Sequence, residues 1–207
     1  MTLHGEVPPA GLLLAAGEGS RLGRPKALLE LGGERLVDRG VHMLREAGCS
    51  PVVVVTGAAE VEVMGAVTVP NPDWRSGMGS SLRTGLGALP PGCPAVVVAL
   101  VDQPRVTAEA VRRLIAAYES GARVAVATYD GRPRNPALFG GEFFADIAES
   151  AVGDVGARRF LRAHADLVTK VPCDDIAAPD DIDTPEDLDA FVRQESSVRR
   201  ESSMRRE

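Results

Sequence analysis

A glycine-rich stretch near the N-terminus holds the residues best suited to chemistry. It runs from Leu14 to Lys26 and contains three glycines, which allow backbone amides to approach phosphate oxygens closely. Arg21 can fork onto phosphate oxygens, and Lys26 can place a compact charge beside them. The stretch is therefore suited to the triphosphate of a nucleotide, although a glycine-rich turn with solvated charges would look similar when taken alone.

Two better-known phosphate loops fit this stretch less well. Its glycines resemble the dinucleotide-binding pattern with one extra residue, but Pro25 interrupts the entry into a helix. The second strand also ends in Thr56 and a glycine, where that fold needs an acidic residue. A P-loop needs Gly-Lys followed by Ser or Thr, whereas Pro25 precedes Lys26 and Ala27 follows it.

Carboxylates that could hold a metal ion occur after one strand and before one helix. Asp102 directly follows an apolar strand, at the rim of a parallel sheet where ligands of open α/β folds bind. Mg²⁺ prefers such oxygen ligands and usually takes one or two carboxylates together with phosphate oxygens and water. Asp102 could instead form a turn before Gln103 and Pro104. Asp183 precedes a helix start, where several other acidic residues crowd the same place and would meet the helix dipole equally well.

The elements that must position these residues alternate between strand and helix patterns. Five short apolar runs are typical of buried parallel strands: 11–16, 51–56, 66–69, 95–100 and 122–129. Four amphipathic segments between or after them can serve as helices: 36–47, 80–88, 108–120 and 142–150. The pattern predicts an α/β fold with a doubly wound, mostly parallel sheet.

Helix starts and composition define one domain. Thr107 and Thr184 are typical N-caps, the second followed by Pro185. We expect a single domain over residues 1–193 and a disordered tail over residues 194–207, where SSVRRE is followed by SSMRRE.

Charge and cysteine content exclude several classes of protein. The net charge is -6 and no basic face is visible, so extended contact with nucleic acid is not expected. No apolar run approaches a membrane span, and the three cysteines are widely separated, which favours a cytoplasmic protein without a disulfide framework or zinc site. Lysine is rare, with only Lys26 and Lys170 in the whole chain.

Five blocks of sequence together resemble the molybdenum cofactor nucleotidyltransferases. LAAGEGSRLGRPK, at 14–26, is similar to the LAAGxSxRMGxxK signature of that family. Further blocks follow in the same order: NPDWRSGMGSSLRTGL at 71–86, VDQPRV at 101–106, GDVGAR at 153–158 and DIDTPEDL at 181–188. The AAG of the first block resembles the cytidylyltransferases, since guanylyltransferases carry AGG there.

The resemblance implies a function, a fold and a set of site residues. It implies a single-domain Rossmann-like sheet of the nucleotide-diphospho-sugar transferase type with one reversed strand, and Mg²⁺-dependent transfer from an NTP with release of pyrophosphate. CTP is the favoured donor and GTP the alternative, with a phosphorylated acceptor, foremost the molybdenum cofactor, and a molybdoenzyme that receives the product. Catalytic roles fall to Lys26, Arg21 and Asp102, and Asp183 becomes the second metal ligand. The expected nucleotide-binding residues are Leu14, Ala15, Ala16, Gly17, Gly19, Ser20, Arg21, Lys26, Gly57, Asn71, Gly79, Ser80 and Ser81.

One departure leaves the acceptor open. Where the family commonly has Gly-His-Pro before a short strand, this chain has Arg134, Asn135 and Pro136. Three other functions therefore stay in view: transfer to another phosphorylated acceptor, a pyridine nucleotide or flavin oxidoreductase built on the same fold, and a noncatalytic chaperone that hands over the cofactor. Trp74 could stack on an acceptor ring or cover the core.

Overall fold

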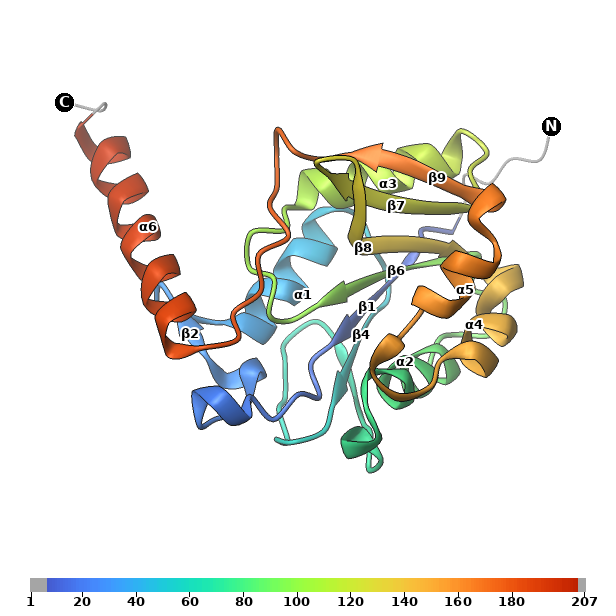
Figure 1. The fold of residues 1–207 in the computed structure, drawn as a ribbon, viewed down its shortest axis with the longest axis horizontal. Coiled ribbons are helices and arrows are strands. Elements are labelled where there is room, and N and C mark those ends of the chain that lie inside the picture. Colours follow the sequence, from blue (N-terminus) through green and yellow to red (C-terminus); the bar gives the residue numbers. More distant parts are fainter. Residues whose placement is uncertain (1–6, 205–207) are drawn as a thin grey trace.

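A seven-stranded sheet forms the centre of the molecule in the computed structural model, which describes residues 7–204 and the side chains of residues 7–195 (Figure 1). The strand order is β5-β4-β1-β6-β8-β7-β9, and all neighbours are parallel except those of β8. A separate two-stranded hairpin, β2 and β3, follows the glycine-rich loop. The strands are β1 (Ala10–Leu14), β2 (Glu30–Leu31), β3 (Glu34–Arg35), β4 (Val52–Thr56), β5 (Val67–Pro70), β6 (Ala95–Leu100), β7 (Val124–Tyr129), β8 (Arg132–Gly140) and β9 (Val168–Pro172).

Helices cover both faces of the sheet and create two hydrophobic cores. One core lies against α1 and α3, and the other lies against α2, α4 and α5. The last helix, α6, extends from one end of the molecule (Figure 1). The helices are α1 (Leu36–Glu46), α2 (Met78–Gly87), α3 (Ala108–Glu119), α4 (Phe144–Ser150), α5 (Arg158–Ala163) and α6 (Pro185–Met204).

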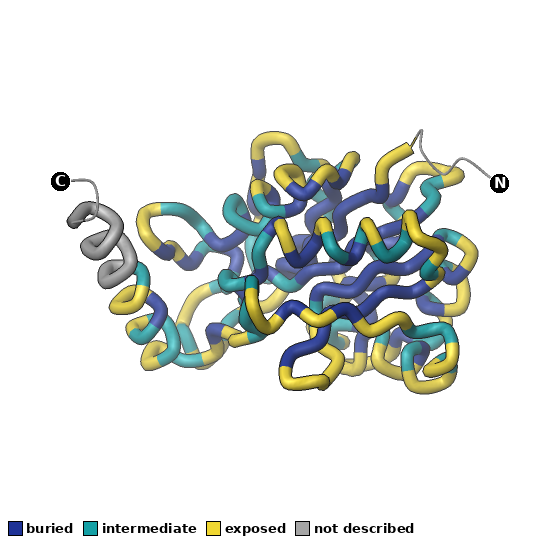
Figure 2. The backbone as a smooth tube through the Cα atoms, turned by 90° about the horizontal axis from the view of Figure 1, so that it is seen from above, coloured by how far each residue is buried: buried dark blue, intermediate teal, exposed yellow. Residues whose placement is uncertain are grey.

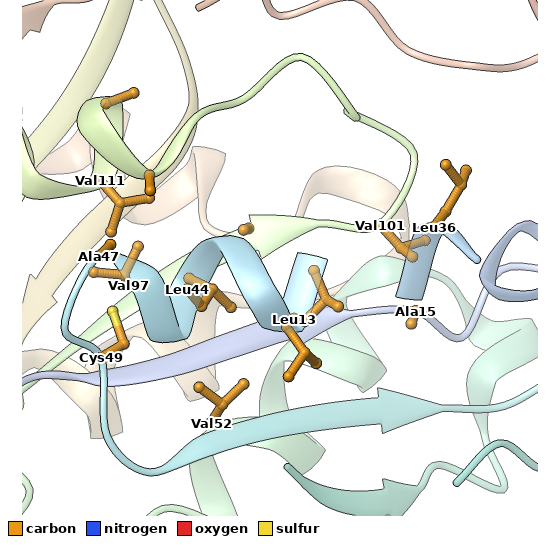
Figure 3. Close-up of a cluster of buried hydrophobic side chains, with 14 of the residues drawn as sticks. Leu13, Ala15, Leu36, Leu44, Ala47, Cys49, Val52, Val97, Val101 and Val111 are labelled. Carbon is orange, nitrogen blue, oxygen red and sulfur yellow. The ribbon is translucent and has the colours of Figure 1, made fainter. Parts of the chain in front are cut away.

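Alternation along each strand divides the apolar side chains between these cores. Leu13 of β1 packs toward α1, whereas Leu12 packs toward α2. Figure 3 shows the first core, in which Leu44 of α1 lies close to Leu13 and Val97. The central strands are buried along their length (Figure 2), and apolar side chains occupy both of their faces, with β-branched residues most frequent in β4, β6 and β7.

The reversed strand β8 brings the beginning of a strand to the rim where the parallel strands end. It is antiparallel to both β6 and β7, and a short turn at residues 130–131 joins it to β7. The pairing shifts between Val126 and Thr128, so Arg134 and Asn135 lie in an irregular part of the ladder. The mostly parallel sheet with one reversed strand is confirmed.

All nine expected elements are present, with ends that match or differ by at most two residues, but the account of the strands needs two corrections. β5 was expected to be buried on both faces, yet it is an edge strand and Val67 is 55% exposed. β8 and β9 were not predicted from periodicity, because charged residues and prolines interrupt their apolar pattern. α6 continues to Met204 and so includes residues 194–204 of the expected tail, because Gln, Glu, Arg and Met favour helix and no Gly or Pro follows Pro185 within it. The division into one domain and a disordered tail stays a prediction. Residues 205–207 of that expected tail lie outside the described residues.

Both expected helix caps are present. The Thr107 side chain accepts a hydrogen bond from the Ala110 amide, and Thr184 accepts one from the Asp187 amide. Within the part of the chain that the structure describes, no helix has the length and apolar character needed to cross a membrane.

Candidate active site

The glycine-rich loop leaves β1 and forms short turns before it reaches Lys26. Gly19 has a φ of 61°, and a Cβ there would lie 2.3 Å from the Arg24 carbonyl oxygen, so this position requires glycine. At Gly17, by contrast, a Cβ would meet nothing within 4 Å. The amides of residues 17–19 donate to no acceptor among the residues the structure describes, so the loop presents free donors to an open space.

Lys26 joins three distant parts of the chain through its side chain. Its Nζ donates to Asp102 Oδ2 at 2.6 Å and to Asp183 Oδ1 at 2.5 Å. Asp102 follows β6, and Asp183 precedes α6, so the two carboxylates are 81 residues apart in sequence yet meet at one ammonium. The structure therefore brings together the lysine and both aspartates that were expected to act together.

Asp183 reaches this place because the segment after β9 runs back across the end of β6. Figure 1 shows the connection passing from β9 toward α6. The Ile182 amide donates to the Asp102 carbonyl at 2.9 Å, and Gln103 donates to Asp181 at 2.8 Å. Asp187 also accepts from the Asp183 amide, which holds that residue at the helix start. We call residues 173–184 the return segment.

The cluster is electrostatically coupled. Burial alone would lower the pKa of Lys26, but charge attraction and hydrogen bonds from Asp102 and Asp183 outweigh it and raise the pKa above its ordinary value. Burial raises the pKa of Asp181, and the nearby charges of Asp102 and Asp183 raise it further, against the hydrogen bond from Gln103. The lysine stays charged at neutral pH and partly neutralises a concentration of negative charge.

A divalent cation fits the chemistry of this cluster. Asp102 and Asp183 both aim a carboxylate oxygen at one point, which the lysine ammonium holds here. No group of three or more His, Cys, Asp or Glu side chains converges anywhere among the described residues. The remaining ligands of such a cation would therefore come from phosphate oxygens and water, as is usual for Mg²⁺.

A cavity of about 560 Å³ lies beside the loop, and we call it the loop cleft. Its acidic lining residues are Glu18, Asp102 and Asp154. The expected nucleotide-binding residues that line it are Leu14, Ala16, Gly17, Gly19, Ser20, Lys26 and Ser81. Those that do not line it are Ala15, Arg21, Gly57, Asn71, Gly79 and Ser80.

The second group instead has structural contacts. Asn71 is buried and donates to the hydroxyls of Ser80 and Ser81, while Ser80 donates back to the Asp73 carbonyl. A Cβ at Gly79 would lie 2.7 Å from the backbone of Ala151, so this glycine allows α2 to pack closely against residues 151–152, which follow α4. These contacts hold the start of α2 against the rim of the loop cleft.

Two other members of that group show different surroundings. Arg21 is exposed on the loop and has no hydrogen-bond or ion-pair partner among residues 7–195, so it is free to turn toward a bound anion. A Cβ at Gly57 would lie 2.6 Å from Trp74, and Trp74 lines the loop cleft with Arg75 stacked on its ring at 4.3 Å. Trp74 is therefore half-buried at the site rather than part of either core.

A second cavity of about 940 Å³ continues across the sheet, and we call it the sheet cleft. Leu14, Met78 and Leu100 line both clefts, so the two adjoin. Its other polar lining residues include a set that sequence reasoning did not single out as site residues: Gln103, Arg158, Arg162, Lys170, Asp180 and Asp181. Only the rarity of lysine pointed to Lys170 beforehand.

Comparison with known proteins places this geometry in context. The family described as "MobA-like NTP transferase domain" matches residues 11–168, which include the glycine-rich loop, Lys26 and Asp102. The match ends before the return segment that carries Asp183.

Individual relatives carry different names. The chain is 38% identical to nicotine blue oxidoreductase of Paenarthrobacter nicotinovorans, over 80% of this chain and 87% of that one. It is 36% identical to a probable molybdenum cofactor guanylyltransferase of Mycobacterium bovis, over 71% of this chain and 75% of that one. The crystal structure of an Rv0371c homologue from Mycobacterium sp. strain JC1 is 34% identical, with a TM-score of 0.76 and coverage of 89% and 97%.

Proposed function

Because the chain belongs to the family of MobA-like NTP transferase domains, we propose that it transfers a nucleoside monophosphate from an NTP to a phosphorylated acceptor and releases pyrophosphate. CTP is the favoured donor, on the strength of Ala15 and Ala16 in the loop. The molybdenum cofactor is the favoured acceptor, and a molybdoenzyme would receive the product. GTP is the alternative donor, since relatives are named guanylyltransferases.

One observation carries this proposal: Lys26 contacts both Asp102 and Asp183 at the edge of an open glycine-rich loop. A site that only holds a nucleotide needs donors for phosphate oxygens. Transfer also needs charge where the α-phosphate and leaving pyrophosphate become more negative. The three side chains supply that charge and two oxygen ligands for a cation.

The residues have separate roles in the transfer. Free amides at 17–19 bind phosphate oxygens, and Lys26 and Arg21 stabilise the charge that develops around the α-phosphate and pyrophosphate. Asp102 and Asp183 would hold Mg²⁺, which when bound orients the phosphates and neutralises their charge. An oxygen of the acceptor phosphate forms the new bond to the α-phosphorus, and the bond to the bridging oxygen of pyrophosphate breaks. The acceptor phosphate is already an anion, so no side chain needs to remove a proton.

Pyrophosphate release tests the proposal directly. Purified protein would be incubated with Mg²⁺ and each of CTP, GTP, ATP and UTP, with molybdenum cofactor or a simple phosphate as acceptor. We expect release with CTP and the cofactor, reduced on the order of 10²- to 10³-fold in Asp102→Asn. Asp146→Asn is a matched control, because Asp146 is exposed in the first turn of α4 and lies outside both clefts. Absence of release with every combination would reject the transferase.

A second candidate is an oxidoreductase that uses a nicotinamide or flavin. The relative named nicotine blue oxidoreductase supports it. The local geometry argues against a dinucleotide-binding turn, because such a turn enters a helix at once, whereas α1 begins at Leu36. Oxidation of NADH or NADPH with an aromatic dye as acceptor, or flavin absorbance in the purified protein, would favour this candidate over transfer.

A further inference from the structure

The floor of the sheet cleft is a row of side chains in cross-strand register. Val98 of β6 pairs with Ala137 of β8, Ala137 pairs with Val126 of β7, and Val126 pairs with Lys170 of β9. All four line the sheet cleft. Side chains paired in register point to the same face of a sheet, so the floor is apolar for three strands and ends on an ammonium at the edge strand.

Other cations gather around the same cavity. Arg134 comes from the irregular start of β8, and Arg158 and Arg162 are four residues apart on α5, which places them on one face of that helix. None of these four basic side chains, the three arginines and Lys170, has an ion-pair partner among residues 7–195.

The acidic side chains of the sheet cleft are, by contrast, already partnered. Asp180 accepts from Arg105 at 2.9 Å, and Asp181 accepts from Gln103 at 2.8 Å. On the opposite face of the sheet, a cavity of about 1090 Å³ also holds charged residues, but Arg39 and Arg112 there are paired with Glu195 and Glu109. Unpaired positive charge therefore distinguishes the sheet cleft.

The reacting end and the cationic end of the cavity are well separated. Asp102 follows β6, whereas Lys170 lies on β9, three strands away in the sheet order. At roughly 4.8 Å per strand this corresponds to about 14 Å. A phosphate that reacts beside Lys26 cannot also reach Lys170, so the distant cations need a different group on the ligand.

We propose that the acceptor carries a second anionic group at the far end of an elongated apolar body, and that Lys170, Arg158 and Arg162 bind this group while Arg134 contacts the body from β8. This inference rests on the proposed function, since it assigns the reacting phosphate to the Lys26 end. It narrows the acceptor to molecules with two separated anionic ends. The cations select the acceptor and take no part in bond formation.

Binding of two matched probes tests this assignment. Biphenyl with a phosphate at one para position and biphenyl with a phosphate at both para positions have the same apolar body and differ in one anionic end. Isothermal titration calorimetry on the full chain, with CTP and Mg²⁺ present, should give about tenfold tighter binding of the bisphosphate. In Lys170→Gln, and in a double variant with Arg158→Gln and Arg162→Gln, this preference should fall to about twofold.

Arg159→Gln is the matched control, since Arg159 is an exposed neighbour on the same helix that does not line the sheet cleft. It should keep the tenfold preference. Equal affinity of the two probes for the wild type would overturn the inference, and so would an equal loss in Arg159→Gln. A bisphosphate preference together with absence of pyrophosphate release from every combination of NTP and acceptor, the molybdenum cofactor included, would reject only the transferase. Pyrophosphate release without a bisphosphate preference would reject only the second anionic end.

Discussion

Lys26 is the residue on which the site depends, because its ammonium group holds the carboxylates of Asp102 and Asp183 together. Asp102 and Asp183 lie on segments that also meet through the Gln103–Asp181 hydrogen bond and through the Ile182 amide, which donates to the Asp102 carbonyl, but only Lys26 contacts both of these carboxylates among the described residues. Without the lysine, two negative charges would face each other at short range and disfavour this arrangement. The same position would then be open to an external cation.

Replacing Lys26 with Met should therefore change the response to magnesium. We expect Lys26→Met to lower stability by about 1 kcal/mol, or roughly 2–4 °C in melting temperature. Millimolar Mg²⁺ should raise the melting temperature of the variant more than that of the wild type, because the cation no longer competes with the ammonium. Thermal unfolding followed by fluorescence, with and without Mg²⁺, measures both effects, and Lys170→Met serves as control. An equal rise in all three proteins would contradict this account.

The sequence predicted the place of a site residue correctly where the residues next to it in the chain form a recognisable motif or strand. Asp102 closely follows β6, and Lys26 ends the glycine-rich loop that leaves β1, and the apolar character of both strands is plain in the sequence. Asn71 and Ser80 could not be assigned in the same way. Their side chains are hydrogen-bonded to each other, but the sequence alone does not distinguish such a pair from two polar residues that bind a ligand. Lys170 depends on strand register, which no local pattern specifies.

At the scale of elements, the start of α2 is held by close packing that only glycine permits. Gly77 and Gly79 lie against residues 151–154, and a Cβ at either position would come within 3 Å of backbone atoms there. This packing sets the position of Ser81 and Met78 at the rim of the loop cleft. The other end of the same helix faces no such neighbour.

Two glycine substitutions in α2 should therefore have opposite effects. Gly79→Ala should destabilise the protein by about 1–3 kcal/mol, since its Cβ would lie 2.7 Å from Ala151. Gly87→Ala should stabilise it by up to about 1 kcal/mol, because a Cβ there meets nothing within 4 Å and alanine favours helix. Urea denaturation would give both values. Changes of the same sign in the two variants would show that helix propensity, rather than packing, decides the outcome.

The elements themselves were predictable to different degrees. α1, α3 and the central strands have strong periodicity and lie within one or two residues of their expected ends. β9 and the first half of β8 have exposed, charged residues, so their place in the sheet is decided by pairing with β7 rather than by burial. The reversed strand was foreseen only from family resemblance.

At the scale of the whole molecule, the chain closes on itself through the return segment. Ile182 is fully buried, and Arg113 binds Asp175 with two hydrogen bonds, so this segment without regular structure is fixed along its path. Its last residues meet the glycine-rich loop, which begins the domain. The site is therefore complete only when both ends of the fold are in place.

Thiol reactivity offers a test of that integrity. Burial raises the pKa of the Cys49 thiol to about 12, and Cys173 is also buried, whereas Cys93 is half-buried. We expect the Cys93 thiol to react readily with a disulfide reagent at pH 8, and the thiols of Cys49 and Cys173 to react only after unfolding. Fast reaction of all three in buffer would contradict the packing described above.

The same burial predicts a pH dependence. Unfolded Cys49 ionises near its ordinary value of 9.0, whereas the folded thiol stays neutral until about 12. The unfolding free energy should therefore fall as pH rises between these values, because the unfolded chain alone loses the proton. Cys49→Ala should show a shallower fall in urea denaturation at several pH values, and an unchanged slope would remove this thiol as the cause.

The reversed strand β8 gives the molecule an interchangeable part. Because β8 runs against its neighbours, its beginning lines the sheet cleft at Pro133, Arg134 and Asn135, and both arms of the hairpin are anchored in the sheet. A change in the length or sequence of this hairpin would alter the shape of the sheet cleft without touching a crossover helix or the glycine-rich loop. One short segment can therefore change the lining of this cleft while the rest of the scaffold keeps its shape.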